Sequence, residues 1–332
     1  MYIMLNYKRL IQLVTAAMLL GPLGSLLAQP TQPFPNRALR LVVPYLPGGG
    51  VDTAARVVGQ RMAEILGQPV VIENKPGANT NIGSEFVAKA TADGYTLLLV
   101  NSSQVANVSL YAGRMPYDLM RDLGPVTLIG TTPVLLVVHP SLPVKTARDL
   151  IALAKARPGQ LTFASAGVGS PTHIAPELFK WMAGIDMLHV PYKGGSQAVI
   201  DIIAGNITCY FAAMSTGLPL AKSGRLRAVA VTSPRRFTAA IPEVPTVAES
   251  GLPGYELVGF FGLMLPRAAP ADTVGVLNAA AVKAIRLPGM NERLLSEGIE
   301  FVAGTPADFD GFLRRELAKY EKLVKAANIR PE

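Results

Sequence analysis

The sequence predicts an α/β fold of two domains with a parallel-rich sheet in each. From Leu39 onward, strand-like and helix-like segments alternate without a long linker or a low-complexity tract. Continuous apolar strands such as 97–100 are typical of parallel sheets that are buried on both faces. The chain has 332 residues, half of them hydrophobic, which exceeds the usual size of one domain, about 100–150 residues.

Periodicity places the elements in two successive sets. The first set is predicted as strand 39–43, helix 51–66, strand 70–73, helix 82–90 and strand 96–100. The second set is predicted as helix 147–156, strand 162–164, helix 171–182, strand 187–190, helix 196–204 and strand 209–212. Two apolar extended stretches, 126–138 and 257–265, are expected to cross between the domains. We therefore expect one domain from 29–132 with 258–332, and a second from 133–257.

The C-terminal segment predicts a helix over 306–324. Thr305 is expected as its N-cap, with Pro306 in the first helical position and Asp308 in the first turn. Apolar residues recur at helical spacing along one stripe, from Phe309 to Val324. Such a stripe is usually a packing face, and we expect it to lie on the first domain.

The N-terminal segment has the pattern of a secretory signal. Lys8 and Arg9 precede an apolar run over 10–20, which is shorter than the about 20 residues of a membrane span. Small residues follow, and cleavage is expected near Ala28, so that residues 1–28 are removed and the mature protein is periplasmic. Cys209 is the only cysteine, which excludes an intramolecular disulfide and a lipid-attachment site after the apolar run.

The charge pattern argues against nucleic-acid binding. The formal net charge is +8, and removal of Lys8 and Arg9 lowers it by two. The positive residues are scattered, and the closest cluster is Arg235 with Arg236. A mild positive field would attract small anions, but the positive net charge is explained equally well as the surface charge that keeps a protein soluble.

Four glycine- or hydroxyl-rich turns each stand between a strand and a helix. They are 48–53, 101–103, 165–173 and 193–196, two from each expected domain. Ligands of open α/β sheets bind at the carboxyl ends of strands, where such turns lie. A glycine turn leading into a helix presents backbone N–H groups and the positive end of the helix dipole, which suits an anion.

The turn 165–173 is the richest of the four. Ser170 is expected as an N-cap and Pro171 as the first helical residue, which leaves the N–H groups of Thr172 and His173 free to bind a carboxylate. The alternative is that Ser165, Ser170 and Thr172 only cap and close the turn. In the turn 48–53, Asp52 is expected as a helix N-cap, with acceptance of a hydrogen bond from a ligand ammonium or a bridging water as a second role.

The sequence offers few residues that could catalyse a reaction. His139, His173 and His189 are the only histidines, and no metal-ligand spacing or nucleophile elbow accompanies them. We expect structural roles for His139 and His189. The turn Gly48-Gly49-Gly50 lacks the Lys-Ser/Thr of a phosphate-binding loop. The sequence therefore indicates no enzyme, no cofactor and no metal.

Several segments taken together resemble the extracytoplasmic solute receptors of the tripartite tricarboxylate transporter family, also called Bug receptors. The resemblance covers nearly the whole mature chain, and the segments that carry it are 40–52, 73–83, 93–96, 191–195 and 243–251. It implies a type II-like periplasmic binding protein, a Venus flytrap, that captures a small carboxylate between two domains and delivers it to two membrane permease subunits. We also expect a monomer.

By position, the resemblance carries the binding role over to residues of all four turns and of the segment after the strand ending at 211. The expected ligand-binding residues are Tyr45, Gly48, Gly49, Asp52, Asn101, Ser102, Ser165, Gly167, Ser170, Thr172, His173, Gly195, Ser196, Phe211 and Ala212. Many relatives have an acidic residue after this strand, whereas this chain has Ala212-Ala213. We therefore expect a ligand without an amino group.

Three other functions stay open on the sequence. A ligand-sensing receptor that feeds a sensor kinase has the same requirements as a transport receptor. An exported hydrolase of a carboxylate ester or a phosphate would use Ser165 or His173. A surface adhesin would expose large apolar patches, of which the alternating pattern gives no sign.

Overall fold

The computed structural model describes residues 33–48, 50–192 and 194–330. The described residues from Phe34 onward form one compact unit. The predicted signal segment and Gly49 lie outside the described residues. Within the described residues, no helix has both the length and the apolar character needed to span a bilayer.

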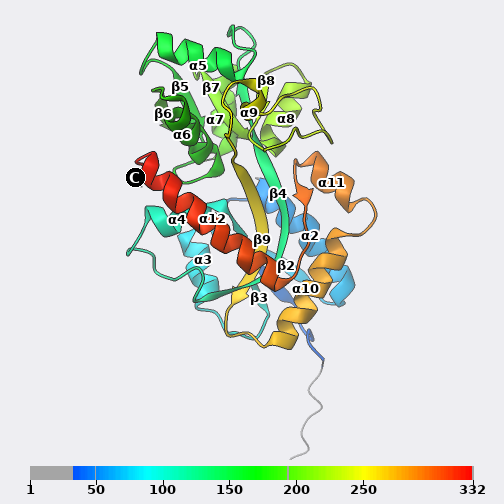
Figure 1. The fold of residues 1–332 in the computed structure, drawn as a ribbon. Helices are drawn as coiled ribbons and strands as arrows, with labels where there is room; N and C mark the ends of the chain where they lie inside the picture. Colours follow the sequence, from blue (N-terminus) through cyan, green and yellow to red (C-terminus); the bar gives the residue numbers. More distant parts are fainter. Residues whose placement is uncertain (1–32, 49, 193, 331–332) are drawn as a thin grey trace, which may run out of the picture. The chain divides into compact units, whose positions relative to one another are not determined.

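The first sheet has the strand order β2-β1-β3-β9-β4, with the short β10 paired to β4 (Figure 1). Its strands are β1 Leu39–Val43, β2 Val70–Asn74, β3 Thr96–Asn101, β4 Leu123–Val138, β9 Val258–Pro266 and β10 Glu300–Phe301. Strand β1 is parallel to β2 and β3, whereas β9 runs antiparallel to both β3 and β4. The predicted strands of this half are confirmed within two or three residues at their ends.

Helices cover both faces of the first sheet. One core contains side chains of α2 Gly50–Leu66, α10 Ala271–Ile285 and α11 Met290–Ser296. The opposite face packs against α3 Asn81–Ala88, α4 Ser102–Leu110 and α12 Pro306–Ala326. Alternate residues of β1 serve the two faces, since Leu41 joins the first core and Val42 the second.

The second sheet has the order β4-β7-β5-β6, with β8 also paired to β4. Its further strands are β5 Thr162–Ser165, β6 Leu188–Pro191, β7 Cys209–Ala213 and β8 Arg227–Val231. One face packs on α5 Ala147–Ala156, α6 Pro171–Ala183 and α9 Val247–Ser250, and the other on α7 Gly195–Ile203 and α8 Met214–Lys222. Strand β5 is parallel to β6 and β7, so three carboxyl ends meet at one edge.

Strand β4 belongs to both sheets. Its residues from Leu123 to Pro133 pair with β9, and those from Val134 to Val138 pair with β7. The apolar stretches 126–138 and 257–265 are therefore strands, as predicted. One hydrophobic core continues along this strand from the first sheet to the second.

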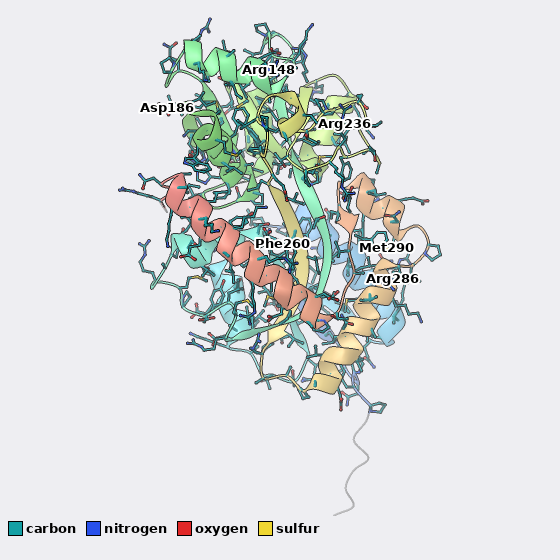
Figure 2. The ribbon with its side chains drawn as sticks, in the orientation of Figure 1. Arg148, Asp186, Arg236, Phe260, Arg286 and Met290 are labelled. Atoms are coloured by element: carbon teal, nitrogen blue, oxygen red, sulfur yellow. The ribbon has the colours of Figure 1, made fainter. Side chains whose placement is uncertain are left out.

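Helix α12 confirms the predicted C-terminal helix and its cap. The Thr305 side chain accepts a hydrogen bond from the Asp308 N–H, and the Asp308 carboxylate accepts one from the Thr305 N–H. The apolar stripe packs on β4, β9 and α4. Phe260 of β9 is labelled in Figure 2. The centre of its ring lies 6.1 Å from that of Phe309 and 5.0 Å from that of Phe312.

Candidate functional site

The turn between β1 and α2 is organised around Asp52. This side chain is 2% exposed and accepts hydrogen bonds from the Gly48 N–H (3.0 Å), Arg56 Nε (2.8 Å) and Asn74 Nδ2 (2.9 Å). Burial opposes ionisation, but the hydrogen bonds from Arg56, Gly48 and Asn74 together hold the pKa of Asp52 below its usual value. Asp52 is therefore a carboxylate whose acceptors are used within the protein.

Two expectations about this turn are wrong. Helix α2 begins at Gly50, so Asp52 lies in its first turn and is not the N-cap. The Gly48 N–H was expected to face an anion, but it donates to Asp52. The reason is the left-handed backbone at Gly48, whose φ of 88° curls the chain back over the start of the helix.

A hydroxyl and amide network links the same turn to α4. The Tyr45 hydroxyl accepts from Asn101 Nδ2 and donates to Ser103 Oγ, each at 2.9 Å. Asn101 also caps α4 through the Ser103 N–H. Strand β3 thus passes directly into α4 without the predicted loop. Ser102 Oγ accepts the Phe260 N–H of β9, so this hydroxyl serves the strand junction.

The turn between β5 and α6 is closed by its own hydroxyls. Ser165 Oγ accepts the Gly167 N–H (3.1 Å) and lies 2.6 Å from His189 Nε2. Ser170 Oγ donates to the Gly167 carbonyl (2.6 Å) and lies 2.8 Å from Thr172 Oγ1, which in turn accepts the Ala166 N–H. Gly167 adopts a φ of 120°. Most contacts of these hydroxyls are therefore with the turn itself, which agrees with the alternative that they only cap and close it.

Ser170 and Pro171 occupy the predicted N-cap and first helical positions. The Ser170 side chain, however, makes no capping hydrogen bond, because it is turned toward Gly167. The His173 N–H was expected to be free, but it donates to the Ser170 carbonyl (2.9 Å). The first turn of α6 therefore has no side-chain cap.

Two neighbouring histidine rings, tilted relative to each other, bond to residues of this turn. The His173 and His189 rings lie 4.2 Å apart, and the Phe163 ring stacks on His189 at 4.9 Å. His173 Nδ1 accepts the Gly169 N–H (3.2 Å). Burial, helped by the neighbouring His189 and Lys180, lowers the pKa of His173 to about 3, and burial with Lys180 lowers that of His189 to about 4. Both rings are therefore neutral at pH 7.

Strand β7 and the start of α7 supply the remaining expected residues. Gly195 begins α7, and Ser196 is exposed beside it. The Phe211 ring is buried in the core against Phe179. Ala212 is buried on the opposite face, under Gly217 of α8. The sequence did not single out Tyr210, whose ring lies on the same face as Ala212 and reaches the first turn of α7.

Helix N-termini from both sheets converge. A Cβ placed on Gly50, the first residue of α2, would lie 2.7 Å from Ser215 Oγ in the first turn of α8. A Cβ on Gly195, the first residue of α7, would lie 3.0 Å from Tyr210 Oη and 3.8 Å from Thr216 Oγ1. Helices α6, α7 and α8 all begin without a side-chain capping bond. Because α2 and α7 both approach the start of α8, and Thr172 of α6 lies near Tyr210, the N-terminal partial positive charges of these helices are concentrated in one region.

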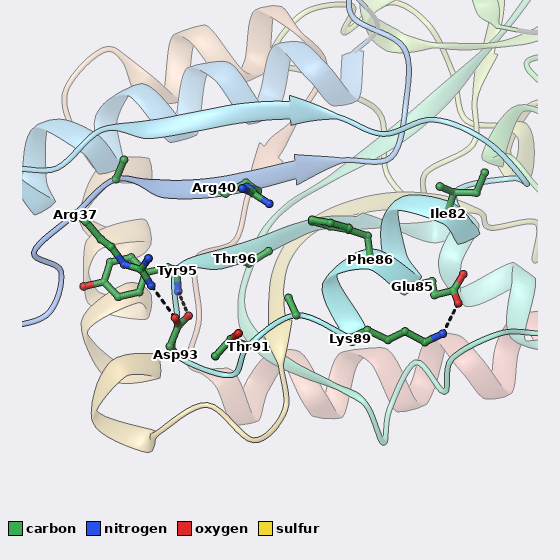
Figure 3. Close-up of a pocket in the computed structure, with 12 residues that line it drawn as sticks. Arg37, Arg40, Ile82, Glu85, Phe86, Lys89, Thr91, Asp93, Tyr95 and Thr96 are labelled. Carbon is green, nitrogen blue, oxygen red and sulfur yellow. Dashed lines mark hydrogen bonds and ion pairs between the residues drawn. The ribbon is translucent and has the colours of Figure 1, made fainter.

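A groove of about 630 Å³ opens elsewhere on the first sheet, along β1, β3 and α3 (Figure 3). Its charged side chains are paired: Arg37 with Asp93 (2.8 Å), Lys89 with Glu85, and Arg40 with Glu73 (2.9 Å). These pairs leave the groove little net charge with which to select a charged ligand. Among the described residues, no group of three or more His, Cys, Asp or Glu side chains is arranged to hold a metal ion.

Comparison with known proteins decides the family. Residues 54–329 match the family model TctC, described as the tripartite tricarboxylate transporter family receptor. The chain belongs to this family. BugT of Bordetella pertussis is 36% identical over 293 residues, which cover 88% of this chain and 90% of BugT.

Solved structures of similar proteins have the same fold. An R. palustris protein solved with adipate superposes with a TM-score of 0.85 at 36% identity, covering 90% of this chain and all of that one. MatC from Rhodopseudomonas palustris, solved with malate, gives 0.80 at 30% identity, with 88% and 100% covered. This TctC receptor thus has the two-domain α/β fold of periplasmic binding proteins, as predicted. The sheets, expected to be parallel-rich, are mixed, because β4 and β9 run antiparallel to their neighbours.

Proposed function

We propose that this receptor captures a small organic anion between its two domains, 29–132 with 258–332 and 133–257, in the periplasm. Membership of the TctC family supports a solute receptor. The adipate and malate in the two R. palustris structures support a carboxylate as the ligand. The receptor then delivers its ligand, unaltered, to the membrane permease subunits of a tripartite tricarboxylate transporter and acts as a monomer. Delivery to a sensor kinase is the alternative that the same site would serve.

The observation that carries this proposal is the meeting of α2 and α8 at their N-termini. Each helix end bears about half a positive charge, and Gly50 and Ser215 bring the two ends into contact range. Two positive ends repel each other unless an anion lies between them. Among the described residues, His173 is neutral and Arg56 is paired with Asp52, so neither is a free cation at these helix ends. The site thus selects an anion through helix dipoles and backbone N–H groups.

The ligand is expected to lack an amino group. Asp52 is the only carboxylate among the candidate residues, and its oxygens are engaged by Arg56, Asn74 and the Gly48 N–H. Ala212 packs against Gly217, where a larger acidic side chain would collide with α8. An ammonium group would therefore meet helix N-termini without a free carboxylate to pair with, which disfavours it.

A thermal-shift screen of mono-, di- and tricarboxylates, aromatic acids, amides and amino acids tests the proposal. A bound acid at about 100 times its dissociation constant should stabilise the protein by about 2.7 kcal/mol. Succinate should stabilise more than aspartate, and glutarate more than glutamate. Absence of any shift across the screen would remove the support for a receptor, and tighter binding of the amino acids would reject the proposed ligand class.

One observation favours a second candidate, an exported hydrolase. Ser165 Oγ lies 2.6 Å from His189 Nε2, the contact that a serine nucleophile makes with its base. The low pKa of His189, about 4, however, makes it a weak base at neutral pH. Ester or phosphate hydrolysis that is abolished by Ser165→Ala would establish this activity; we expect none.

A further inference from the structure

The Tyr210 hydroxyl is a buried polar group that the fold leaves unused. Tyr210 is fully buried on β7, and its Oη has no hydrogen-bond partner within the described part of the chain. Two other buried or half-buried tyrosines are satisfied: Tyr255 donates to the Ala175 carbonyl, and Tyr45 bonds to Asn101 and Ser103. An unsatisfied buried hydroxyl destabilises a fold unless a ligand supplies its hydrogen bond.

The hydroxyl lies where three uncapped helices begin. The Cβ position of Gly195 places Tyr210 Oη beside the first residue of α7 and near Thr216 in the first turn of α8. Thr172, in the first turn of α6, is close enough to offset part of the rise in pKa that burial imposes on Tyr210, although no partner meets hydrogen-bond geometry. Thr172 Oγ1 is already used by the Ala166 N–H and Ser170.

We infer that Tyr210 is a specificity residue of the receptor, whose hydroxyl donates a hydrogen bond to an anionic oxygen of the ligand at the N-termini of α6, α7 and α8. This inference rests on the proposed function and adds a residue to it. Because burial raises its pKa, the phenol keeps its proton at neutral pH. It can then donate to a carboxylate oxygen, and it offers less to an amide, whose oxygen is a weaker acceptor.

The glycine at position 195 makes room for the Tyr210 hydroxyl. A side chain at 195 would press on Tyr210 Oη at 3.0 Å, tighter than ordinary van der Waals contact. The absence of a side chain therefore lets the first turn of α7 approach the phenol. Ligand binding at this turn brings the ligand next to a buried hydroxyl that has no hydrogen-bond partner among the described residues.

The test compares two variants that each remove one buried, unpartnered hydroxyl. Tyr320 is the matched control, because its Oη is also buried without a partner in the described structure. It belongs to the packing face of α12 and not to the region where α6, α7 and α8 begin. Both Tyr210→Phe and Tyr320→Phe should keep or raise the melting temperature, because each deletes an unsatisfied polar atom. Calorimetric titration with adipate and with its neutral diamide, adipamide, then measures affinity and acid selectivity.

Tyr210→Phe should weaken adipate binding about 10- to 100-fold and reduce the preference for adipate over adipamide, because a hydrogen bond to a charged group is lost. Tyr320→Phe should change neither. Unchanged adipate affinity in Tyr210→Phe would overturn the inference and leave the proposed function standing. If the wild-type protein binds neither adipate nor any acid in the screen, both the inference and the proposed function are overturned. If Tyr210→Phe does not fold, Gly195→Ala, which presses on the same oxygen, replaces it with the same expected loss of affinity and selectivity.

Discussion

Gly50 of α2 and Ser215 of α8 face each other so closely that a Cβ on the glycine would lie 2.7 Å from the serine Oγ. The two residues come from helices on different sheets, and both lie at helix N-termini. Their contact brings two positive dipole ends together, which is the physical basis for the proposed anion site.

A carboxylate placed at this contact should act as a built-in ligand. Ser215→Asp is expected to raise thermal stability, by about 0.3–1 kcal/mol from the dipole of α8, and to weaken adipate binding about 100-fold or more by repulsion. Ser215→Asn is the control of similar size without the charge. Calorimetry that gives the two variants the same adipate affinity would contradict an anion site at these helix ends.

The packing of α8 against the first sheet can be tested with a pair of glycines. Gly298 and Gly289 have nearly the same positive φ, 78° and 79°, but a Cβ on Gly298 would lie 2.0 Å from the Met214 Cβ, whereas Gly289 has open space. In urea unfolding, Gly289→Ala should lose about 1–2 kcal/mol from backbone strain alone. Gly298→Ala should lose about 1–3 kcal/mol more from the collision. Equal losses would show that α8 does not press on Gly298.

The two neighbouring histidines predict a pH dependence of stability. The folded pKa of His173, about 3, is far below the usual 6.5. Between these two pH values the unfolded chain binds a proton at this residue and the folded protein does not. Stability is therefore complete above about pH 6.5 and falls as the pH drops toward 3, by up to about 1.4 kcal/mol per pH unit for this residue. Urea unfolding at several pH values measures this slope.

His173→Asn is the variant for this test, because its Oδ1 can accept the Gly169 N–H in place of Nδ1 while the side chain no longer titrates. The slope between pH 6 and pH 4 should become shallower than in the wild type. Carboxylates with lowered pKa values also titrate in this range, but they are common to both proteins. Identical slopes would mean that His173 is protonated in the folded state.

Asp52 is expected to stabilise the β1–α2 turn without contacting the ligand. Asp52→Asn weakens charge-assisted hydrogen bonds from Arg56 and Gly48, and should lower stability at pH 7 by about 1–3 kcal/mol. Its lowered folded pKa means that this contribution is present above about pH 3.9 and disappears as the pH falls through the folded value. Any change in the affinities of succinate and aspartate should be equal. A selective loss for aspartate would instead make Asp52 a ligand for the ammonium group.

The order of elements was predictable because each strand and helix carries its own periodicity. Helix 147–156 and strand 39–43 were predicted at their observed bounds. Helix α4 was missed because Asn101 caps it directly at the end of β3, so that no loop separates the two elements. Hydroxyl and amide residues between two apolar runs indicated a turn at 101–103. The capping bond of Asn101 instead starts a helix there.

The site was predictable only in part, because its decisive contacts join residues far apart in the sequence. The turn between β5 and α6 was located correctly, yet the bond from Ser165 to His189 spans 24 residues and leaves no local signal. Tyr210 stood between Cys209 and Phe211 in an apolar strand, where a tyrosine is expected to pack. Only the fold shows that its hydroxyl lies beside Gly195 and has no hydrogen-bond partner among the described residues.

The most direct test of the proposed anion site is a calorimetric comparison of an acid with its neutral amide at equal ionic strength, using adipate and adipamide. Because helix N-termini stabilise a negative charge and no free carboxylate is available to an amide donor, adipate should bind at least about tenfold more tightly, a difference of about 1.4 kcal/mol. Equal binding of the two compounds, or tighter binding of adipamide, would contradict the claim that the convergence of α2, α6, α7 and α8 selects an organic anion.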